Sequence, residues 1–99
     1  MRPPHLWRVL LSLNPFRTEA SGANAVIKVT EFKHNRTTGD TVCLRKTEAF
    51  DGITTTVLES ASGYTITVVD TNEYKFTSTG TATTGDVTGG GSIATAGPV

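Results

Sequence analysis

The sequence predicts an all-β fold, a small antiparallel β-barrel or β-sandwich of five to six strands with an extended N-terminal arm. Three observations lead to this prediction. Apolar residues alternate with a period of two over residues 63–77, the chain contains 19 threonines, and Asp, Asn and Gly separate the alternating stretches. Threonine is β-branched and favours strands. With 99 residues, the chain is long enough for one domain.

Residues 63–77 are expected to form a β-hairpin that supplies about half of the core. Successive side chains of a strand point to opposite faces, so an alternating pattern buries every second residue. Asp70-Thr71-Asn72 is the predicted reversal, because Asp and Asn bond their own backbone and tolerate left-handed conformations. The inward side chains are expected to be Tyr64, Ile66, Val68, Tyr74 and Phe76.

Residues 1–17 are predicted to form the arm, and residues 18–99 the β domain. Pro3 and Pro4 oppose a regular start, since each fixes φ and lacks a backbone donor. The apolar residues that follow exceed what so small a core can bury, which favours docking of the arm onto a neighbouring chain. The alternative is that the arm folds back over the open end of its own barrel. The predicted partner-binding residues are Leu6, Trp7, Leu10, Leu11, Leu13 and Phe16.

This apolar stretch fits neither a secretion signal nor a membrane span. Arg8 interrupts it, residues 9–13 are too short for a signal core, and no small-residue cleavage site follows. A membrane-spanning helix needs about 20 apolar residues. We therefore expect no membrane insertion.

Residues 25–32 form the first predicted strand of the domain, and it is apolar on both faces. Val26 and Phe32 fall on one face, and Ile27 and Val29 on the other. A strand of this kind is either central in its sheet or partly covered by another chain.

Three more strands are expected along the chain. Residues 41–46 form the second, with Val42 and Leu44 pointing inward. Residues 53–58 form the third, and residues 93–96 a short final strand. The Thr- and Gly-rich segment before this last strand is too small and polar to pack, and we expect a loop or a weak edge strand there.

Cysteine and charge narrow the possible partners. Cys43 is the only cysteine, so no internal disulfide can form; we interpret it as a small strand residue, with an intermolecular disulfide as the alternative.

The formal net charge is zero, but residues 1–46 carry +5 and residues 47–99 carry −5. Such a dipole suits head-to-tail packing of copies, whereas the plainer interpretation is two charge clusters facing solvent.

The sequence predicts no enzyme, no cofactor and no metal site. His5 and His34 lack a second sulfur ligand for zinc, and His34 is expected to make polar contacts within its loop. Glu48 and Asp51 are the closest pair of acids considered for acid–base chemistry, and their place in a turn favours a structural role. The neutral total charge argues against nucleic-acid binding, which needs a basic surface with stacking aromatics.

Sugar binding is the alternative to a structural role in which the arm docks onto a neighbouring chain. A glycan-binding module contacting host surface sugar would expose Tyr64 or Tyr74 on a β face. If the chain is instead a structural protein that docks through its arm, we expect both tyrosines to be buried and Trp7 to lie in an interface.

A series of short motifs, taken in order, resembles a repeat found in phage virion proteins. The resemblance covers about residues 14–96, and the repeat is similar to the FCCH β-barrel of ubiquitin-activating enzymes. Where the repeat has Gly after His, this chain has Asn35, which also tolerates a positive φ. The matching motifs are Asn14-Pro15-Phe16, Ser21-Gly22, residues 26–30, His34, Thr38-Gly39-Asp40-Thr41-Val42, Phe50-Asp51-Gly52-Ile53, residues 63–67, residues 70–76 and Gly89-Gly90-Gly91.

The resemblance implies a non-enzymatic structural component of a tailed-phage virion, either tail-associated or on the head surface. The implied partners are other virion proteins, and the implied state is a homo-oligomer or symmetric assembly. No catalytic residue is carried over. The catalytic cysteine of ubiquitin-activating enzymes lies outside their FCCH module, so the resemblance gives Cys43 no chemical role.

Overall fold

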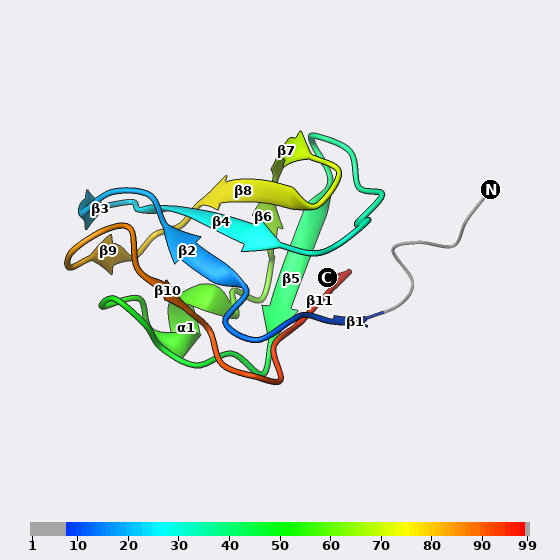
Figure 1. Cartoon of the computed structure of the whole chain (residues 1–99). Helices are drawn as coiled ribbons and strands as arrows, with labels where there is room; N and C mark the ends of the chain where they lie inside the picture. Colours follow the sequence, from blue (N-terminus) through cyan, green and yellow to red (C-terminus); the bar gives the residue numbers. More distant parts are fainter. Residues whose placement is uncertain (1–7, 99) are drawn as a thin grey trace.

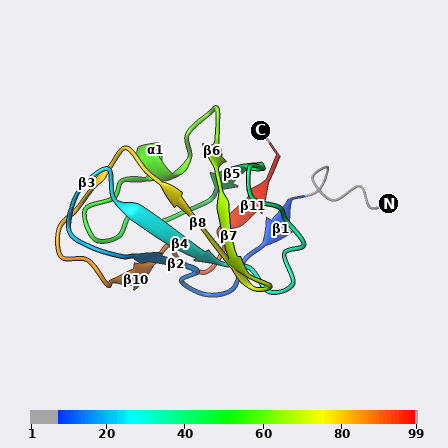
Figure 2. The same ribbon diagram turned by 90° about the horizontal axis from the view of Figure 1, so that it is seen from above.

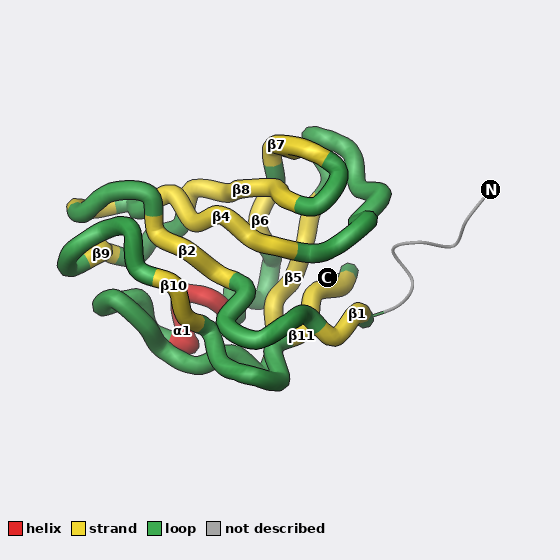
Figure 3. Tube along the Cα trace, in the orientation of Figure 1, coloured by secondary structure: helices red, strands yellow, loops and turns green. Residues whose placement is uncertain are grey.

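Short β-strands and long connections make up the computed structural model, which describes residues 8–98 (Figures 1 and 3). The predicted all-β class is confirmed. The strands are shorter and more numerous than predicted, and within residues 8–98 they form open sheets and no closed barrel. The elements are β1 (Val9–Leu10), β2 (Phe16–Thr18), β3 (Gly22–Ala23), β4 (Val26–Thr30), β5 (Thr41–Arg45), α1 (Thr55–Leu58), β6 (Tyr64–Thr65), β7 (Thr67–Asp70), β8 (Glu73–Thr77), β9 (Thr81–Ala82), β10 (Thr88–Gly89) and β11 (Thr95–Gly97).

Two larger sheets organise these strands. One has five strands in the order β10-β2-β4-β8-β7, and the other has four in the order β1-β11-β5-β6. All their pairings are antiparallel. Seen from above, β4 and β8 run side by side across the molecule, and β11 and β1 lie together near the C-terminus (Figure 2). A small third sheet joins β3 to β9.

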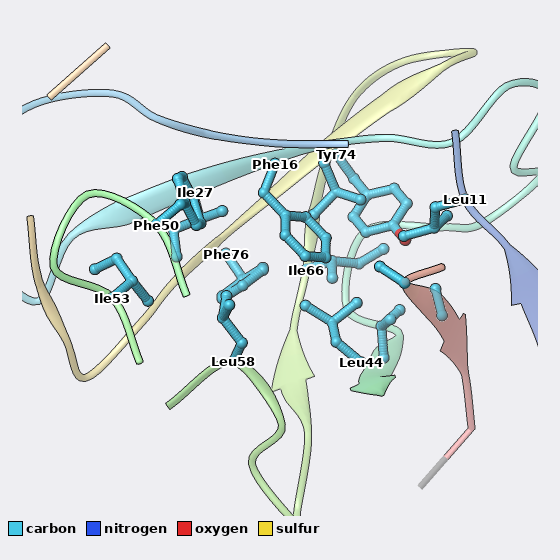
Figure 4. Close-up of a cluster of buried hydrophobic side chains, with 14 of the residues drawn as sticks. Leu11, Phe16, Ile27, Leu44, Phe50, Ile53, Leu58, Ile66, Tyr74 and Phe76 are labelled. Atoms are coloured by element: carbon cyan, nitrogen blue, oxygen red, sulfur yellow. The ribbon is translucent and has the colours of Figure 1, made fainter. Parts of the chain in front are cut away.

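The core contains side chains from both larger sheets and from α1 (Figure 4). Ile27 and Val29 of β4, Tyr74 of β8 and Leu44 of β5 are all buried in it. β4 is the middle strand of the five-stranded sheet, which is one of the two arrangements predicted for residues 25–32. Its second face carries Val26, Lys28 and Thr30, which are half-buried.

The predicted hairpin is present in part, as β7 and β8. Residues 64–65 form β6 instead, which pairs with β5. Val68 pairs with Tyr74, and the chain reverses between Asp70 and Glu73. Oδ1 of Asp70 accepts a hydrogen bond of 2.8 Å from the Asn72 N–H, which is the local bond that the Asp-Thr-Asn sequence predicted.

Residues 53–58, predicted as a strand, contain a short helix instead. The Thr54 side chain caps α1 by accepting a bond of 3.2 Å from the Val57 N–H, and Leu58 is fully buried. The prediction was wrong because a threonine side chain can satisfy a helix N-terminus, and apolar residues at 53, 57 and 58 suit one helical turn as well as a strand.

The predicted arm is part of the fold from Arg8 onward. β1 pairs with β11, and β2 pairs with both β4 and β10, so the predicted boundary between residues 17 and 18 falls inside a strand. The described part of the arm therefore follows the alternative in which the chain folds back on its own domain. Residues 1–7 lie outside the described residues.

Candidate partner-binding site

An apolar groove runs along β1, at the edge of the four-stranded sheet. We call it the edge groove. Its volume is about 270 Å³, and one side is the chain around β1 while the other is the turn that follows β4. The residues that line it are Val9, Leu10, Leu11, Ser12, Glu31 and Phe32.

Strand geometry explains which side chains of the β1 segment are exposed. Leu11 donates its N–H to the Ala94 carbonyl at 2.8 Å, which continues the register of β1 against β11. Alternation along the strand directs the Leu11 side chain into the core and the Leu10 side chain outward. Leu11 is accordingly buried, and Leu10 is 65% exposed.

Phe32 forms the opposite wall of the groove. It follows directly after the buried Glu31, and the chain turns at Lys33, which has a φ of +52°. Phe32 is 67% exposed, and Leu13, which follows the groove residues of the β1 segment, is 70% exposed. Leu10 and Phe32 are therefore large, exposed apolar side chains on facing walls of one groove.

A buried ion pair between Glu31 and Arg36 supports the groove wall that Phe32 forms. Glu31 Oε1 accepts a bond of 3.0 Å from Arg36 Nε, and Glu31 Oε2 accepts a bond of 3.3 Å from Arg36 Nη2. The Tyr74 hydroxyl donates to the same Oε1 at 2.7 Å. These charge-assisted bonds fix the backbone at Glu31 and therefore fix the position of Phe32 beside it.

Burial and the Glu31 carboxylate control the titration of this cluster. Burial raises the pKa of Tyr74, and the nearby Glu31 charge raises it further, so the phenol stays protonated and remains a donor. Burial by itself would lower the pKa of Arg36, but its hydrogen bonds and charge interactions with Glu31 and Tyr74 together raise it. Both groups therefore keep the protonation states that the hydrogen bonds require.

His34 closes the other side of the same cluster. Its Nε2 donates to the Asp70 carbonyl at 2.6 Å, and its Nδ1 accepts from the Arg36 N–H at 2.9 Å. The ring also meets Tyr74 edge-on, with centroids 5.2 Å apart. The predicted polar role of His34 within its loop is confirmed, and both of its ring nitrogens serve the fold.

The predicted partner-binding residues separate into three groups. Leu10 and Leu13 are exposed, and Leu10 lines the edge groove, whereas Leu11 and Phe16 are buried in the core. Leu6 and Trp7 lie outside the described residues. The burial of Phe16 corrects the prediction that it contacts a partner, because its ring packs against Phe50 at a centroid distance of 6.2 Å.

Phe32 is one of four groove residues, with Val9, Ser12 and Glu31, that were not assigned to a site from the sequence. Its signal was present in the sequence, because the apolar residues on both faces of residues 25–32 indicated a central strand or one covered by another chain. The structure places Ile27 and Val29 in the core and leaves Phe32 exposed after the strand ends.

The side chains that other functions would use are positioned differently. Tyr74 is fully buried, and Tyr64 is half-buried and stacked on Phe76 at 4.4 Å, so the sugar-binding alternative loses the two rings on which it depended.

Cys43 is a free thiol with no exposed surface. In the part of the chain that the structure describes, no three His, Cys, Asp or Glu side chains gather as a metal-binding group. No helix among residues 8–98 is long and apolar enough to cross a membrane.

These features define a small all-β domain with an apolar groove at an open sheet edge. Comparisons of the chain with protein-family models, with curated proteins and with solved structures found no match.

Proposed function

We propose that the chain is a non-enzymatic structural component of a tailed-phage virion, tail-associated or on the head surface, that docks onto neighbouring virion proteins through the edge groove. The observation that carries the docking is the exposure of Leu10 and Phe32 on the two walls of one apolar groove. The resemblance of residues 14–96 to a phage virion repeat supports the proposed location in a phage virion.

The size of this surface favours repeated contacts. Burying one large apolar side chain contributes about 1.5–3 kcal/mol. Leu10 and Phe32 are each about two-thirds exposed, so together they contribute roughly 2–4 kcal/mol. Association costs an estimated 4–15 kcal/mol in lost motion, so one such contact is weak by itself. In a symmetric particle the same contact is repeated many times. Each contact that forms raises the effective concentration for the next one, so the total affinity exceeds that of a single contact.

The test is incorporation into particles. Phage particles would be assembled with the wild-type chain, with Leu10→Lys/Phe32→Lys, or with the control Val69→Lys, which changes an exposed apolar residue on β7. Quantitative mass spectrometry of gradient-purified particles would count copies of the chain. We expect stoichiometric wild-type and control chain, and loss of the groove variant although it folds by circular dichroism. Absence of the wild-type chain from purified particles would overturn the proposal.

A further inference from the structure

One outer edge of the five-stranded sheet is covered by a loop rather than by a strand. β7 is the terminal strand at this edge, and the connection from β4 to β5 passes beside it (Figure 1). We call residues 34–40 of this connection the strap. These residues form no strand, so they do not extend the sheet. An uncovered edge strand would present its unpaired N–H and C=O groups to other chains.

Backbone bonds attach the strap to the chain just before β7. The Gly39 N–H donates to the Ile66 carbonyl at 2.9 Å, and the Ile66 N–H donates to the Asp40 carbonyl at 2.9 Å. Both backbone polar groups of Ile66 are therefore occupied by the strap.

Side chains of the strap cover the edge of β7 itself. Thr38 Oγ1 accepts a hydrogen bond of 2.9 Å from the Val68 N–H, and His34 Nε2 donates to the Asp70 carbonyl at 2.6 Å. The strap backbone is turned on itself here, because the Arg36 N–H donates to Nδ1 of the same His34. Side chains thus take the place that a neighbouring strand would fill.

β7 has little protection of its own before its bulge. Natural sheet edges are protected by lysine, proline, bulges or covering segments. The register of β7 shifts between Val68 and Asp70, which makes the end of the strand irregular. The residues before Asp70 are uncharged, and Val69 is 44% exposed. Closure of the edge at Val68 therefore depends on the strap.

We propose that the strap is an autoinhibitory contact that keeps β7 from pairing with β7 of a second copy of this chain. When the strap is released, the Ile66 groups and the Val68 N–H become free on each copy. Two equivalent edges then pair antiparallel about a two-fold axis. Because antiparallel strands run in opposite directions, Asp70, the one charge of β7, lies away from Asp70 of the other copy. This inference concerns a different edge from the edge groove and does not rest on the proposed docking.

The first measurement is the hydrogen exchange rate of the Val68 amide, corrected for intrinsic exchange. Thr38→Val removes the acceptor without changing the shape of an exposed side chain, and should speed this exchange about fivefold or more. Thr38→Ser keeps the hydroxyl and should restore a rate close to that of the wild type. Thr67→Val is the matched control, since it makes the same chemical change on an exposed threonine of β7 outside the strap.

The second measurement is self-association by sedimentation velocity. Thr38→Val/Gly39→Ala should loosen the strap further, because alanine is strained at the Gly39 φ of +101°. This variant should self-associate about tenfold more strongly than the wild type. Adding Val69→Lys should abolish the gain, because a lysine on an edge strand opposes pairing. If the double variant does not fold, Thr38→Val alone serves for both measurements.

Four results would overturn the proposal. Unchanged Val68 exchange in Thr38→Val would show that the strap does not close the edge. A folded, strap-loosened variant that associates no more than the wild type would show that the edge does not pair. A gain that persists with Val69→Lys would place the contact elsewhere, and an equal gain in Thr67→Val would attribute it to added apolar surface. These measurements use the isolated chain, so they stand apart from the test of incorporation into particles.

Discussion

The Tyr74 hydroxyl donates a hydrogen bond of 2.7 Å to Oε1 of Glu31 in the interior of the protein. Tyr74 lies on β8 of the five-stranded sheet, and Glu31 lies directly after β4, in the wall of the edge groove. This bond therefore connects the five-stranded sheet to the surface that we propose binds a partner.

Tyr74→Phe should destabilise the domain by about 1–3 kcal/mol, because it leaves a buried carboxylate oxygen without one of its donors. Urea unfolding followed by circular dichroism measures this loss. Tyr64→Phe is the matched control, since the Tyr64 hydroxyl donates at 2.6 Å to the Val57 carbonyl from a half-buried position, where water can replace it. Equal losses for the two variants would contradict the special role of the Tyr74 bond.

The Arg36–Glu31 pair should behave as a unit. Both side chains are almost fully buried, so removing one partner leaves an uncompensated charge. Arg36→Met and Glu31→Gln are each expected to cost about 3–5 kcal/mol, and the double variant less than the sum of the two. Unfolding free energies for the four proteins of the cycle give the coupling. Arg36→Lys, which keeps the charge but loses the two-pronged contact, provides a milder variant if Arg36→Met does not fold.

Additive losses in this cycle, within about 0.5 kcal/mol, would show that the two side chains do not stabilise each other. Wild-type-like incorporation of Arg36→Lys into particles, together with reduced stability, would show that the ion pair supports the fold without positioning Phe32.

The sequence was most informative where structure is local. The alternation in residues 63–77 and the Asp-Thr-Asn reversal predicted the hairpin, since both signals act within a few residues. Asn35, which replaces glycine in the resembling repeat, does adopt a positive φ of +58°. The exposure of Leu10 was also predicted, because the apolar stretch exceeded what a small core can hold.

Contacts between distant parts of the chain were not predictable in the same way. β1 pairs with β11, and Phe16 packs on Phe50, so the burial of the arm depends on residues that no local pattern connects to it. Likewise, Glu31 was predicted to lie in a strand and Arg36 in the loop after it, and no local pattern indicated that the two pair beside Tyr74 and His34. The groove itself arises from Leu10 and Phe32, which meet only when the two larger sheets pack together.

Asp51 should make stability depend on pH in the acid range. Its Oδ2 accepts from Thr18 Oγ1 at 2.7 Å and from the Gly85 N–H at 2.9 Å, while its Oδ1 accepts from the Thr84 N–H at 2.9 Å. The Thr18 hydroxyl and these backbone donors lower the pKa of Asp51 below its ordinary value of 3.8. A carboxylate with a lowered folded pKa stabilises the protein above its unfolded pKa, and this stabilisation is lost as the pH falls through the folded value.

Asp51→Asn should therefore lower the melting temperature at neutral pH, and its difference from wild type should shrink as the pH falls below 3.8. Thermal unfolding at a series of pH values measures both effects. Asp86→Asn is the control, because Asp86 forms an exposed ion pair with Arg17 that is expected to contribute little. A difference that stays constant down to the lowest pH would mean that the Asp51 charge is not what stabilises this loop.

Gly90 should tolerate a side chain less well than Gly39, because the chain at Gly90 passes directly over Phe16. Its φ is +111°, and a Cβ would lie 2.3 Å from Cδ2 of Phe16. Gly39 has a similar φ of +101° with nothing within 4 Å of the added atom. Gly39→Ala should cost about 1–2 kcal/mol from backbone strain alone, and Gly90→Ala roughly 1–3 kcal/mol more, because the fully buried Phe16 ring cannot move aside. Urea unfolding of the two variants compares them directly. Equal losses would mean that the Phe16 ring has room to shift within the core.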